Sequence, residues 1–362
     1  MPHWPKADLN LRCYPDVPAN VSMPWDAADE FLINEATKPV SLILNDRYGA
    51  LSCAFPDAQL WHDSFCAQVA TQQNRSENGL PQAKFLNHPD LSDAFTQASS
   101  DGDNSIVLIR IPKQKEQLSE QLHYLSKISP DATVLLAGMA KHIPIPLLNW
   151  LEDHADHYEQ LPVVRKARLI KIRGLAGFRD LTPSTRSYEI NGFYLSAPAG
   201  VFCGDRPDPG ARALLRHLPT NQTGIICDLG CGNGILSVHL ANNNPEATII
   251  GTDDSMLATL AARANLRANS LNGDIRQGNI LSSVDDTLDT VICNPPFHDG
   301  HKQLTSIAES MFHESFHQLR SGGELLVVAN RHLPYTKVLK RLFRNVELIS
   351  DDKRFNIYRC IR

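Results

Sequence analysis

In the C-terminal half of the chain, short hydrophobic runs alternate with segments in which apolar residues recur every three to four positions. The runs have the length of buried strands, and the segments between them have helical spacing. The predicted strands are 224–228, 247–252, 289–293 and 324–329, and a closing antiparallel pair is 346–349 and 356–361. The predicted helices are 235–242, 256–269 and 306–319, the last closed by Gly322 and Gly323. This alternation predicts a mostly parallel sheet with helices on both faces.

The N-terminal half repeats this order weakly. Val-Ser-Leu-Ile-Leu-Asn-Asp at 40–46 and Tyr-Gly-Ala-Leu-Ser at 48–52 resemble Ile-Cys-Asp at 226–228 and Gly-Ile-Leu-Ser at 234–237. A second block matches at a constant offset of 191 positions and pairs Asp63, Ser64, Ala67, Ala70, Asn74 and Asn78 with Asp254, Ser255, Ala258, Ala261, Asn265 and Asn269. Three more blocks keep the order, namely 107–112 with 291–296, 141–142 with 331–332, and 165–172 with 353–360. A duplicated α/β domain explains this order, and chance likeness between two α/β sheets is the alternative.

The two predicted copies differ in the residues that could carry chemistry. The N-terminal copy has one glycine, Gly49, where the other has three, and Arg-Ile-Pro-Lys at 110–113 where the other has Asn-Pro-Pro-Phe. We therefore expect residues 1–173 to form a degenerate domain that is structural or binds substrate. Residues 190–362 would form the catalytic domain, and 174–189, rich in Gly, Pro, Ser and Thr, the linker.

Composition narrows the class of protein. The chain has 362 residues, a net charge of −5 and an apolar fraction of 42%, as expected for an ordinary two-domain globular protein. It has no apolar run of signal-peptide or membrane-span length. The eight cysteines are scattered without a C-x-x-C pair, so we expect reduced thiols in a cytoplasmic protein and no metal site.

The first candidate site is Asp-Leu-Gly-Cys-Gly-Asn-Gly at 228–234, which follows a predicted strand. Gly230, Gly232 and Gly234 allow a tight turn that brings backbone N–H groups close to a ligand. Asp228 can meet the ammonium group of the methionine part of S-adenosylmethionine, a cofactor without the phosphates that a dinucleotide loop serves. A tight strand–helix turn without a ligand is the alternative.

Two further residues are candidates for cofactor binding. Asp253 ends the second strand, 19 positions after Gly234, and its carboxylate could accept hydrogen bonds from both ribose hydroxyls. Its alternative role as a helix cap can be filled by Asp254 or Ser255. Asn279 could bind the adenine edge, although Gly-Asn is also a common turn.

The second strong motif is Asn-Pro-Pro-Phe at 294–297, 66 positions after Asp228. An exocyclic amine is a poor nucleophile because its lone pair is delocalised. The side-chain oxygen of Asn294 and the carbonyl of Pro295 can accept its two hydrogens and aim the lone pair at a methyl group. Pro296 stiffens the turn, and Phe297 can stack on a flat substrate. Together the two motifs predict methyl transfer from S-adenosylmethionine to an exocyclic or amide nitrogen, with a Pro-Pro turn as the alternative.

Positive charge is concentrated in two segments that occupy equivalent places in the repeats. Residues 331–362 contain nine Lys and Arg against three acidic residues, and residues 165–186 contain seven against one. Two basic edges could form a track for phosphates. A solvated charged surface is the alternative.

These residues resemble a known family. The pairing of the 228–234 and 294–297 motifs is similar to class I methyltransferases that act on amino nitrogens, and the degenerate N-terminal half narrows the likeness to tandem-domain ribosomal RNA guanine-N2 methyltransferases. Three stretches most resemble the large-subunit (23S rRNA) type: Trp-Asp-Ala-Ala-Asp-Glu at 25–30, Leu-Ile-Leu-Asn-Asp with Gly-Ala-Leu-Ser-Cys at 42–46 and 49–53, and Val-Ala-Asn-Arg-His-Leu at 328–333.

The resemblance implies two Rossmann-like domains, each with a seven-stranded sheet, and S-adenosylmethionine bound only in the C-terminal one. It implies methylation of one guanine N2 in free 23S rRNA by a monomer without a stable protein partner. Cofactor residues would be Asp228, Gly230, Gly232, Gly234, Asp253 and Asn279, and Asn294, Pro295, Pro296 and Phe297 would hold the guanine. One segment departs from the family, which has Arg and Gly after Val-Phe-Ser. Here 201–208 reads Val-Phe-Cys-Gly-Asp-Arg-Pro-Asp.

Three other functions remain open on the sequence. A 16S rRNA guanine-N2 enzyme has the same chemistry and architecture. A protein glutamine methyltransferase also uses Asn-Pro-Pro, usually followed by Tyr, but has no evident use for the first domain. A non-catalytic RNA-binding assembly factor would not need Asp228 or Asn294.

Overall fold

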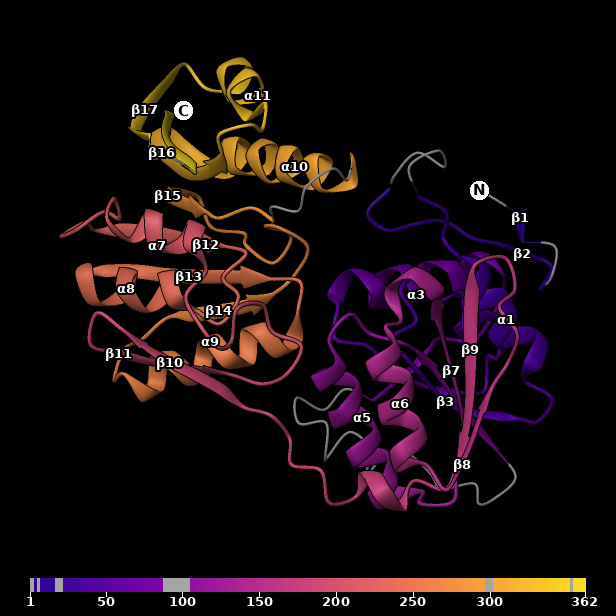
Figure 1. The fold of residues 1–362 in the computed structure, drawn as a ribbon. Helices are drawn as coiled ribbons and strands as arrows, with labels where there is room; N and C mark the ends of the chain where they lie inside the picture. The colour runs from indigo at the N-terminus through magenta and orange to yellow at the C-terminus, as the bar shows by residue number, and fades with distance from the viewer. Residues whose placement is uncertain (1–2, 5–6, 17–21, 87–104, 297–301, 352–353) are drawn as a thin grey trace. The chain divides into compact units, whose positions relative to one another are not determined.

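The computed structural model describes residues 3–4, 7–16, 22–86, 105–296, 302–351 and 354–362. The chain divides by its internal contacts into an N-terminal unit, Met1–Ser184, and a C-terminal unit, Thr185–Arg362 (Figure 1). The division falls inside 174–189, the segment expected to be a linker. Much of that segment is structured: η3 (Ala176–Phe178) buries Phe178 in the N-terminal unit, and β10 (Arg186–Ile190) belongs to the C-terminal unit.

The N-terminal unit contains a seven-stranded sheet with the order β5-β4-β3-β6-β7-β9-β8. Its strands are β3 (Val40–Leu44), β4 (Gln59–Trp61), β5 (Lys84–Phe85), β6 (Ile106–Arg110), β7 (Thr133–Met139), β8 (His157–Gln160) and β9 (Ala167–Arg173). Its helices are α1 (Ala27–Glu35), α2 (Ala50–Ala54), α3 (Phe65–Glu77), α5 (Lys115–Ile128), α6 (Ile145–His154) and the short η2 (Ala140–His142). A small hairpin, β1 (His3–Trp4) and β2 (Leu9–Asn10), precedes them.

The C-terminal unit contains a second seven-stranded sheet with the order β14-β13-β12-β15-β16-β18-β17. Its strands are β12 (Gly224–Leu229), β13 (Ala247–Asp253), β14 (Asp274–Gln277), β15 (Leu288–Cys293), β16 (Leu319–Asn330), β17 (Asn345–Asp351) and β18 (Phe355–Ile361). Its helices are α7 (Pro209–Leu215), α8 (Ile235–Asn243), α9 (Met256–Ala268), α10 (Lys302–Gln318) and α11 (Tyr335–Leu342). The β10 strand pairs with β11 (Phe193–Ala197) in a separate hairpin.

The two sheets have the same strand order and the same strand directions. In each, the first five strands in this order are parallel, and the sixth is antiparallel to both of its neighbours, so the seventh again runs in the direction of the first five. The offset of 191 also holds for α3 and α9, which are capped by Ser64 and Ser255 through the same side-chain bond. The predicted tandem α/β architecture with two mostly parallel seven-stranded sheets is therefore confirmed.

In the C-terminal sheet, neighbouring residues of the central strands enter different hydrophobic clusters, as parallel strands covered on both faces require. In β12, Ile226 packs with residues of α7, α8 and α9, whereas Cys227 packs with residues of α10 and α11. In the N-terminal unit, α1 and α2 pack on the sheet through Leu32 and Leu51, and α5 and α6 both contact η3, with Lys115 of α5 over the ring of Trp150 of α6.

Two aspects of the predicted elements were wrong or incomplete. Gly322 and Gly323 do not close a helix; they lie inside β16, where they exchange backbone hydrogen bonds with Arg362. An added Cβ on Gly323 would lie 3.0 Å from two backbone oxygens, so the close strand contact explains this glycine. The helices α7 and α11 and the β10–β11 hairpin were not predicted, because they are short and two of them contain or follow prolines.

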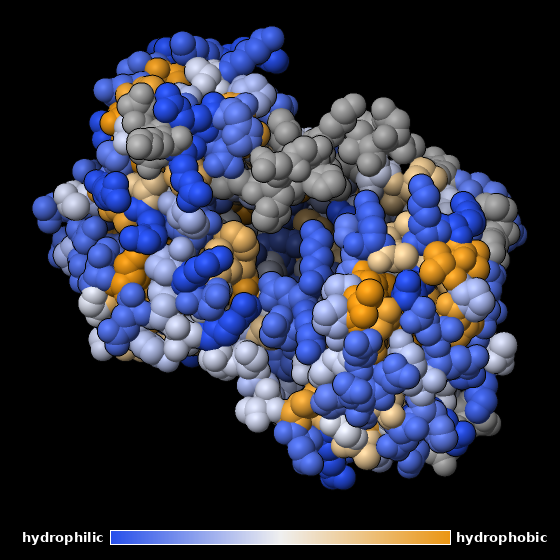
Figure 2. Space-filling model, viewed as in Figure 1, coloured by the Kyte–Doolittle hydropathy of each residue, from blue (hydrophilic) through white to orange (hydrophobic). Residues whose placement is uncertain are grey.

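No helix in the described part of the chain is long and apolar enough to cross a membrane. The visible surface of each unit is mostly hydrophilic, with separate hydrophobic patches (Figure 2). Within the same described ranges, no group of three or more His, Cys, Asp and Glu side chains is arranged to hold a metal ion.

Candidate active site at the carboxyl edge of the second sheet

The glycine motif forms the turn between β12 and α8. All three glycines have positive φ: 77° at Gly230, 53° at Gly232 and 83° at Gly234. A Cβ on Gly234 would lie 2.9 Å from the Cα of Ala262 in α9, so this glycine also allows two helices to approach. The turn is held from the neighbouring strand, because the N–H groups of Gly230 and Cys231 both donate to the carbonyl of Thr252.

Asp228 lies beneath this turn and is fully buried. The hydroxyl of Ser237 donates to its Oδ2 at 2.6 Å, while its Oδ1 is buried without a hydrogen-bond partner in the described structure. Burial raises the pKa of Asp228 to about 7, and the bond from Ser237 only partly offsets this. One carboxylate oxygen is thus fixed and the other is left for a donor or a cation.

Asp253 ends β13 beside the glycine turn. Its Oδ2 accepts from the N–H of Gly232 at 2.9 Å, and its Oδ1 accepts from the N–H of Ser255 at 2.9 Å. Burial raises its pKa, and these two N–H groups act in the opposite direction. Ser255 itself caps α9, so the carboxylate of Asp253 is not used as the helix cap and keeps lone pairs for hydroxyl donors.

Asn279 follows β14 and opens a turn. Its backbone N–H donates to the Oγ of Ser282, and its carbonyl accepts from the N–H of the same residue. The bond from Gly278 N–H to the carbonyl of Asp253 ties this turn to the end of β13. The turn geometry accounts for the backbone of Asn279, and adenine binding by its side chain remains a prediction.

Asn294 follows the last residue of β15. Its Nδ2 donates to the Oδ2 of Asp208 at 3.0 Å, and its Oδ1 is buried without a hydrogen-bond partner in the described structure. Pro295 is buried and Pro296 is exposed. Phe297, predicted to stack on the substrate, lies outside the described residues.

The register of the sheet brings these candidates to one edge. Leu229 pairs with Thr252 of β13 and with Cys293 of β15, so the residues that follow them, Gly230, Asp253 and Asn294, leave three adjacent parallel strands at the same level. The carboxyl edge of a doubly wound sheet is where such folds bind ligands. The six predicted cofactor residues therefore share one edge with Asn294, Pro295 and Pro296, which we call the clamp.

Sequence reasoning missed three side chains that support this edge. Asp208 holds the amide of Asn294, and Ser237 holds Asp228. Tyr188 of β10 accepts from Nδ2 of the buried Asn233 at 2.9 Å. The only sequence signal for Asp208 was the Asp-Pro pair, which is typical of a helix start.

The N-terminal sheet has the same register, and this identifies what replaced each candidate. Leu44 pairs with Trp61 and Ile109 as Leu229 pairs with Thr252 and Cys293. The equivalent positions are Ile43 for Asp228, Asn45 for Gly230, Arg47 for Gly232, Gly49 for Gly234, His62 for Asp253 and Arg110 for Asn294. By strand register Asp46 corresponds to Cys231 and not to Asp228, but its carboxylate accepts from Ser52 as that of Asp228 accepts from the equivalent Ser237.

The backbone of the lost site is retained although its chemistry is not. Asn45 keeps a positive φ of 64°, and Gly49 keeps a φ of 78° and the close approach to α3. Nδ1 of His62 accepts from Ser64 N–H at 2.9 Å, as Asp253 accepts from Ser255. Two of the three glycines are replaced by Asn45 and Arg47, the strand position of Asp228 is occupied by Ile43, and the buried acid of this turn, Asp46, comes one residue after Asn45.

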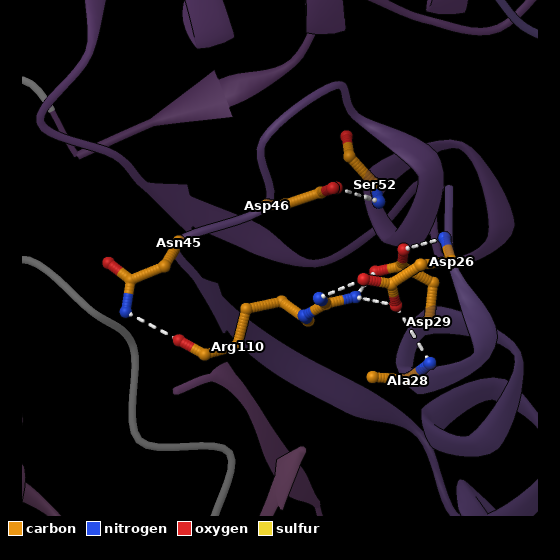
Figure 3. A network of polar contacts seen from close by, with 7 residues as sticks. All are labelled: Asp26, Ala28, Asp29, Asn45, Asp46, Ser52 and Arg110. Atoms are coloured by element: carbon orange, nitrogen blue, oxygen red, sulfur yellow. Dashed lines mark hydrogen bonds and ion pairs between the residues drawn. The ribbon is translucent and has the colours of Figure 1, made fainter. Parts of the chain in front are cut away.

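An ion-pair network lies at the edge of the N-terminal sheet (Figure 3). Arg110 donates to both carboxylate oxygens of Asp26, at 2.8 and 2.9 Å, and also pairs with Asp29. Burial disfavours the charge of Arg110, but Asp29 and Asp26 raise its pKa overall. Burial raises the pKa of Asp46 nearby to about 7, and the charge of Asp29 adds to this. Asn45 closes the network by donating to the carbonyl of Arg110 at 2.9 Å.

Comparisons with known proteins agree with this division. Residues 2–175 match the family described as RLMG N-terminal domain, and residues 192–359 match the family described as Methyltransferase small domain. Two relatives named Ribosomal RNA large subunit methyltransferase G, from Photobacterium profundum and Klebsiella pneumoniae, are each 33% identical to the chain. The first match covers 98% of this chain and 97% of the relative, and the second covers 99% and 98%.

The chain belongs to the ribosomal RNA large subunit methyltransferase G family. A solved structure with the same fold is the T. thermophilus 16S rRNA N2 methyltransferase in complex with AdoMet and guanosine, with a TM-score of 0.79 and 18% identity, covering 100% of this chain and 97% of that one. Both halves of the chain therefore have the arrangement of a tandem-domain methyltransferase. Membership of the large-subunit family agrees with the likeness of residues 25–30, 42–53 and 328–333.

Proposed function

We propose that this protein transfers a methyl group from S-adenosylmethionine to the exocyclic N2 of a guanine in 23S ribosomal RNA. Membership of the large-subunit methyltransferase G family supports the class of substrate. The observation that carries the chemistry is the buried, unpartnered Oδ1 of Asn294, one residue beyond a strand that pairs with the glycine-loop strand. An acceptor in that place suits an amine with two hydrogens to donate.

The residues of the C-terminal edge fit the cofactor. The unpartnered Oδ1 of Asp228 would take the ammonium group, and Asp253 would accept from the ribose hydroxyls. The positive-φ glycines 230, 232 and 234 keep side chains away from the ligand, and Asn279 would meet the adenine edge. When bound, the cofactor supplies an electrophilic methyl group on a sulfonium.

The clamp acts by positioning. Oδ1 of Asn294 and the carbonyl of Pro295 would accept the two hydrogens of the guanine N2, which holds the nitrogen with its lone pair directed at the methyl group. Pro295 and Pro296 contribute no competing N–H donors. The nitrogen releases a proton readily once methylated, so the site requires no strong base. Phe297 would stack on the base.

The experiment is to incubate the protein with tritiated S-adenosylmethionine and separately with unmodified 23S rRNA, 16S rRNA and a release factor. We expect N2-methylguanosine in free 23S rRNA alone. The same nucleoside in 16S rRNA would keep the chemistry and change the target. Label in the release factor would assign the clamp to a glutamine amide. No label with substrates that a known enzyme methylates would favour a binding protein.

Asn294→Ala tests the proposed role of the clamp directly. It removes the acceptor but leaves the glycine turn and Asp228 in place, so cofactor affinity should stay within a few-fold. Turnover should fall by roughly two orders of magnitude or more, because positioning supplies much of the barrier reduction. A loss of cofactor affinity as large as the loss of rate would contradict this role for Asn294.

A further inference from the structure

A single hydrogen bond joins the clamp to the start of a helix 86 positions earlier in the chain. Oδ2 of Asp208 accepts from Nδ2 of Asn294 at 3.0 Å and from the N–H of Ala211 at 2.8 Å. Asp208 is the N-cap of α7, and Pro209 is the first residue of that helix. The carboxylate is thus fixed by its own helix while it holds the amide of Asn294.

This bond decides which way the amide of Asn294 faces. An ionised carboxylate can only accept hydrogen bonds, so the NH₂ of the amide must face Asp208. The oxygen of the amide then faces away from Asp208, and it is the buried atom that lacks a partner. Without Asp208, rotation by 180° about the last side-chain bond would present a donor where the proposed substrate amine also presents donors.

We propose that Asp208 is a positioning residue that holds the amide of Asn294 with its oxygen toward the substrate amine. The inference rests on the function proposed above, because it needs Asn294 to accept from the amine. Asp208 does not contact the substrate in this account and acts through Asn294. It lies at the end of 201–208, the segment that departs from the family's sequence.

The N-terminal unit contains the same contact between a helix N-cap carboxylate and the side chain that follows a strand, but with a different residue at the strand end. Asp26 is the N-cap of α1, as Asp208 is of α7, and it binds the side chain of Arg110, which occupies the position of Asn294. The link from helix cap to strand end is therefore present in both copies. Where no substrate amine is expected, the strand-end residue is a cation that pairs with carboxylates. Where one is expected, the residue keeps a free acceptor.

Two substitutions separate the role in positioning from the role in helix capping. Asp208→Asn keeps an oxygen that can accept from both Ala211 and Asn294, so kcat should stay within a few-fold. Asp208→Ser keeps a good helix cap but is too short to hold the amide. Its kcat should fall roughly 10- to 100-fold while cofactor Kd and Tm change little, because misplacement by about 1 Å can cost that much. Asp208→Thr, also a helix cap, replaces the Ser variant if that variant does not fold.

The same measurements in an Asn294→Ala background decide whether Asp208 acts through Asn294. Single-turnover rates with tritiated cofactor and full-length protein should show that Asp208→Ser costs nothing further once the amide is gone. An equal fold-loss in both backgrounds, or full kcat in Asp208→Ser alone, would overturn the proposal. If Asn294→Ala itself turns over normally, the proposed function of the clamp fails, whatever Asp208 does.

Discussion

At the scale of single residues, the candidate site is made of buried polar atoms whose hydrogen bonding is incomplete. Oδ1 of Asp228 and Oδ1 of Asn294 have no partner in the described structure, although each residue's other polar atom is bonded. Leaving such an atom buried and unpaired costs about 1–3 kcal/mol. Each cost would be offset by a ligand group that donates to that atom, as we propose for the cofactor at Asp228 and for the substrate amine at Asn294.

Asp228 should make cofactor affinity depend on pH. Because burial raises its pKa to about 7, a cationic ligand group must displace a proton below that pH. We expect the Kd for S-adenosylmethionine to be up to roughly tenfold weaker at pH 6 than at pH 8. Calorimetric titration should show this slope in the wild type, and in Asp228→Asn a weaker affinity that varies with pH only through titration of the ligand. Titration of the ligand itself affects both proteins equally, so an identical slope in the variant would contradict the role of Asp228.

The same shift affects stability with a definite sign. The pKa of Asp228 is raised on folding from 3.8 to about 7, so the folded protein binds more protons than the unfolded chain between these values. The contribution of Asp228 to folding is therefore full below about pH 4 and is lost as pH rises toward 7. Without ligand, the contribution of Asp228 to folding stability is therefore smallest above about pH 7, where its carboxylate is ionised and can pair with a cation.

At the scale of elements, the sequence predicted the structure best where the two units repeat the same residues in the same local contacts. Asn74 and Asn265, 191 positions apart, each donate to a carbonyl in the preceding turn, Tyr48 and Asn233 respectively. The likeness of Asp46 to Asp228 matched the contact with the following serine but not the register, because strand pairing places Asn45 at the position of Gly230. Asp208 was missed because its bond to Asn294 spans 86 positions and no local pattern reports such a contact.

Arg110 should be essential to the stability of the N-terminal unit. Its side chain is 19% exposed and pairs with the half-exposed Asp26 and the buried Asp29, so Arg110→Met would leave the buried carboxylate of Asp29 without its partner. Removing one partner of a buried ion pair costs about 3–5 kcal/mol. We expect urea unfolding to show a decrease of that size in the free energy of unfolding, while cofactor affinity in the C-terminal unit stays unchanged.

Arg165→Met is the matched control for this experiment. Arg165 pairs with Glu30 of the same helix α1, and its side chain is 67% exposed whereas that of Glu30 is 11% exposed. Because the guanidinium end of this pair is solvated, Arg165→Met should lose clearly less stability than Arg110→Met, whose guanidinium is largely buried. Asp29→Asn added to Arg110→Met should recover part of the loss. Equal, small losses in both arginine variants would mean that burial does not set the cost.

At the scale of the whole molecule, duplication has left one fold with two different edges. The C-terminal unit keeps the acid, the three glycines and the Asn-Pro-Pro turn, whereas the N-terminal unit fills the same positions with Ile43, Asn45, Arg47, His62 and Arg110. The N-terminal unit also carries one of the two basic segments, including the exposed Lys171 and Arg173 of β9. We infer that cofactor binding and RNA binding are divided between the units, with the N-terminal one holding the RNA.

A fragment of residues 185–362 tests this division. It begins before β10 and so keeps Tyr188, which binds Asn233 of the glycine turn, whereas a cut at 190 would remove it. We expect the fragment to bind S-adenosylmethionine within a few-fold of the full chain, because every predicted cofactor residue and its described partners lie within it. Its affinity for 23S rRNA should be at least tenfold lower, with a shallower dependence on salt, because the phosphate contacts of the first unit are gone. Filter binding at several salt concentrations measures both quantities. Equal RNA affinity and an equal salt slope would place the whole RNA site in the C-terminal unit and leave the N-terminal unit with a structural role.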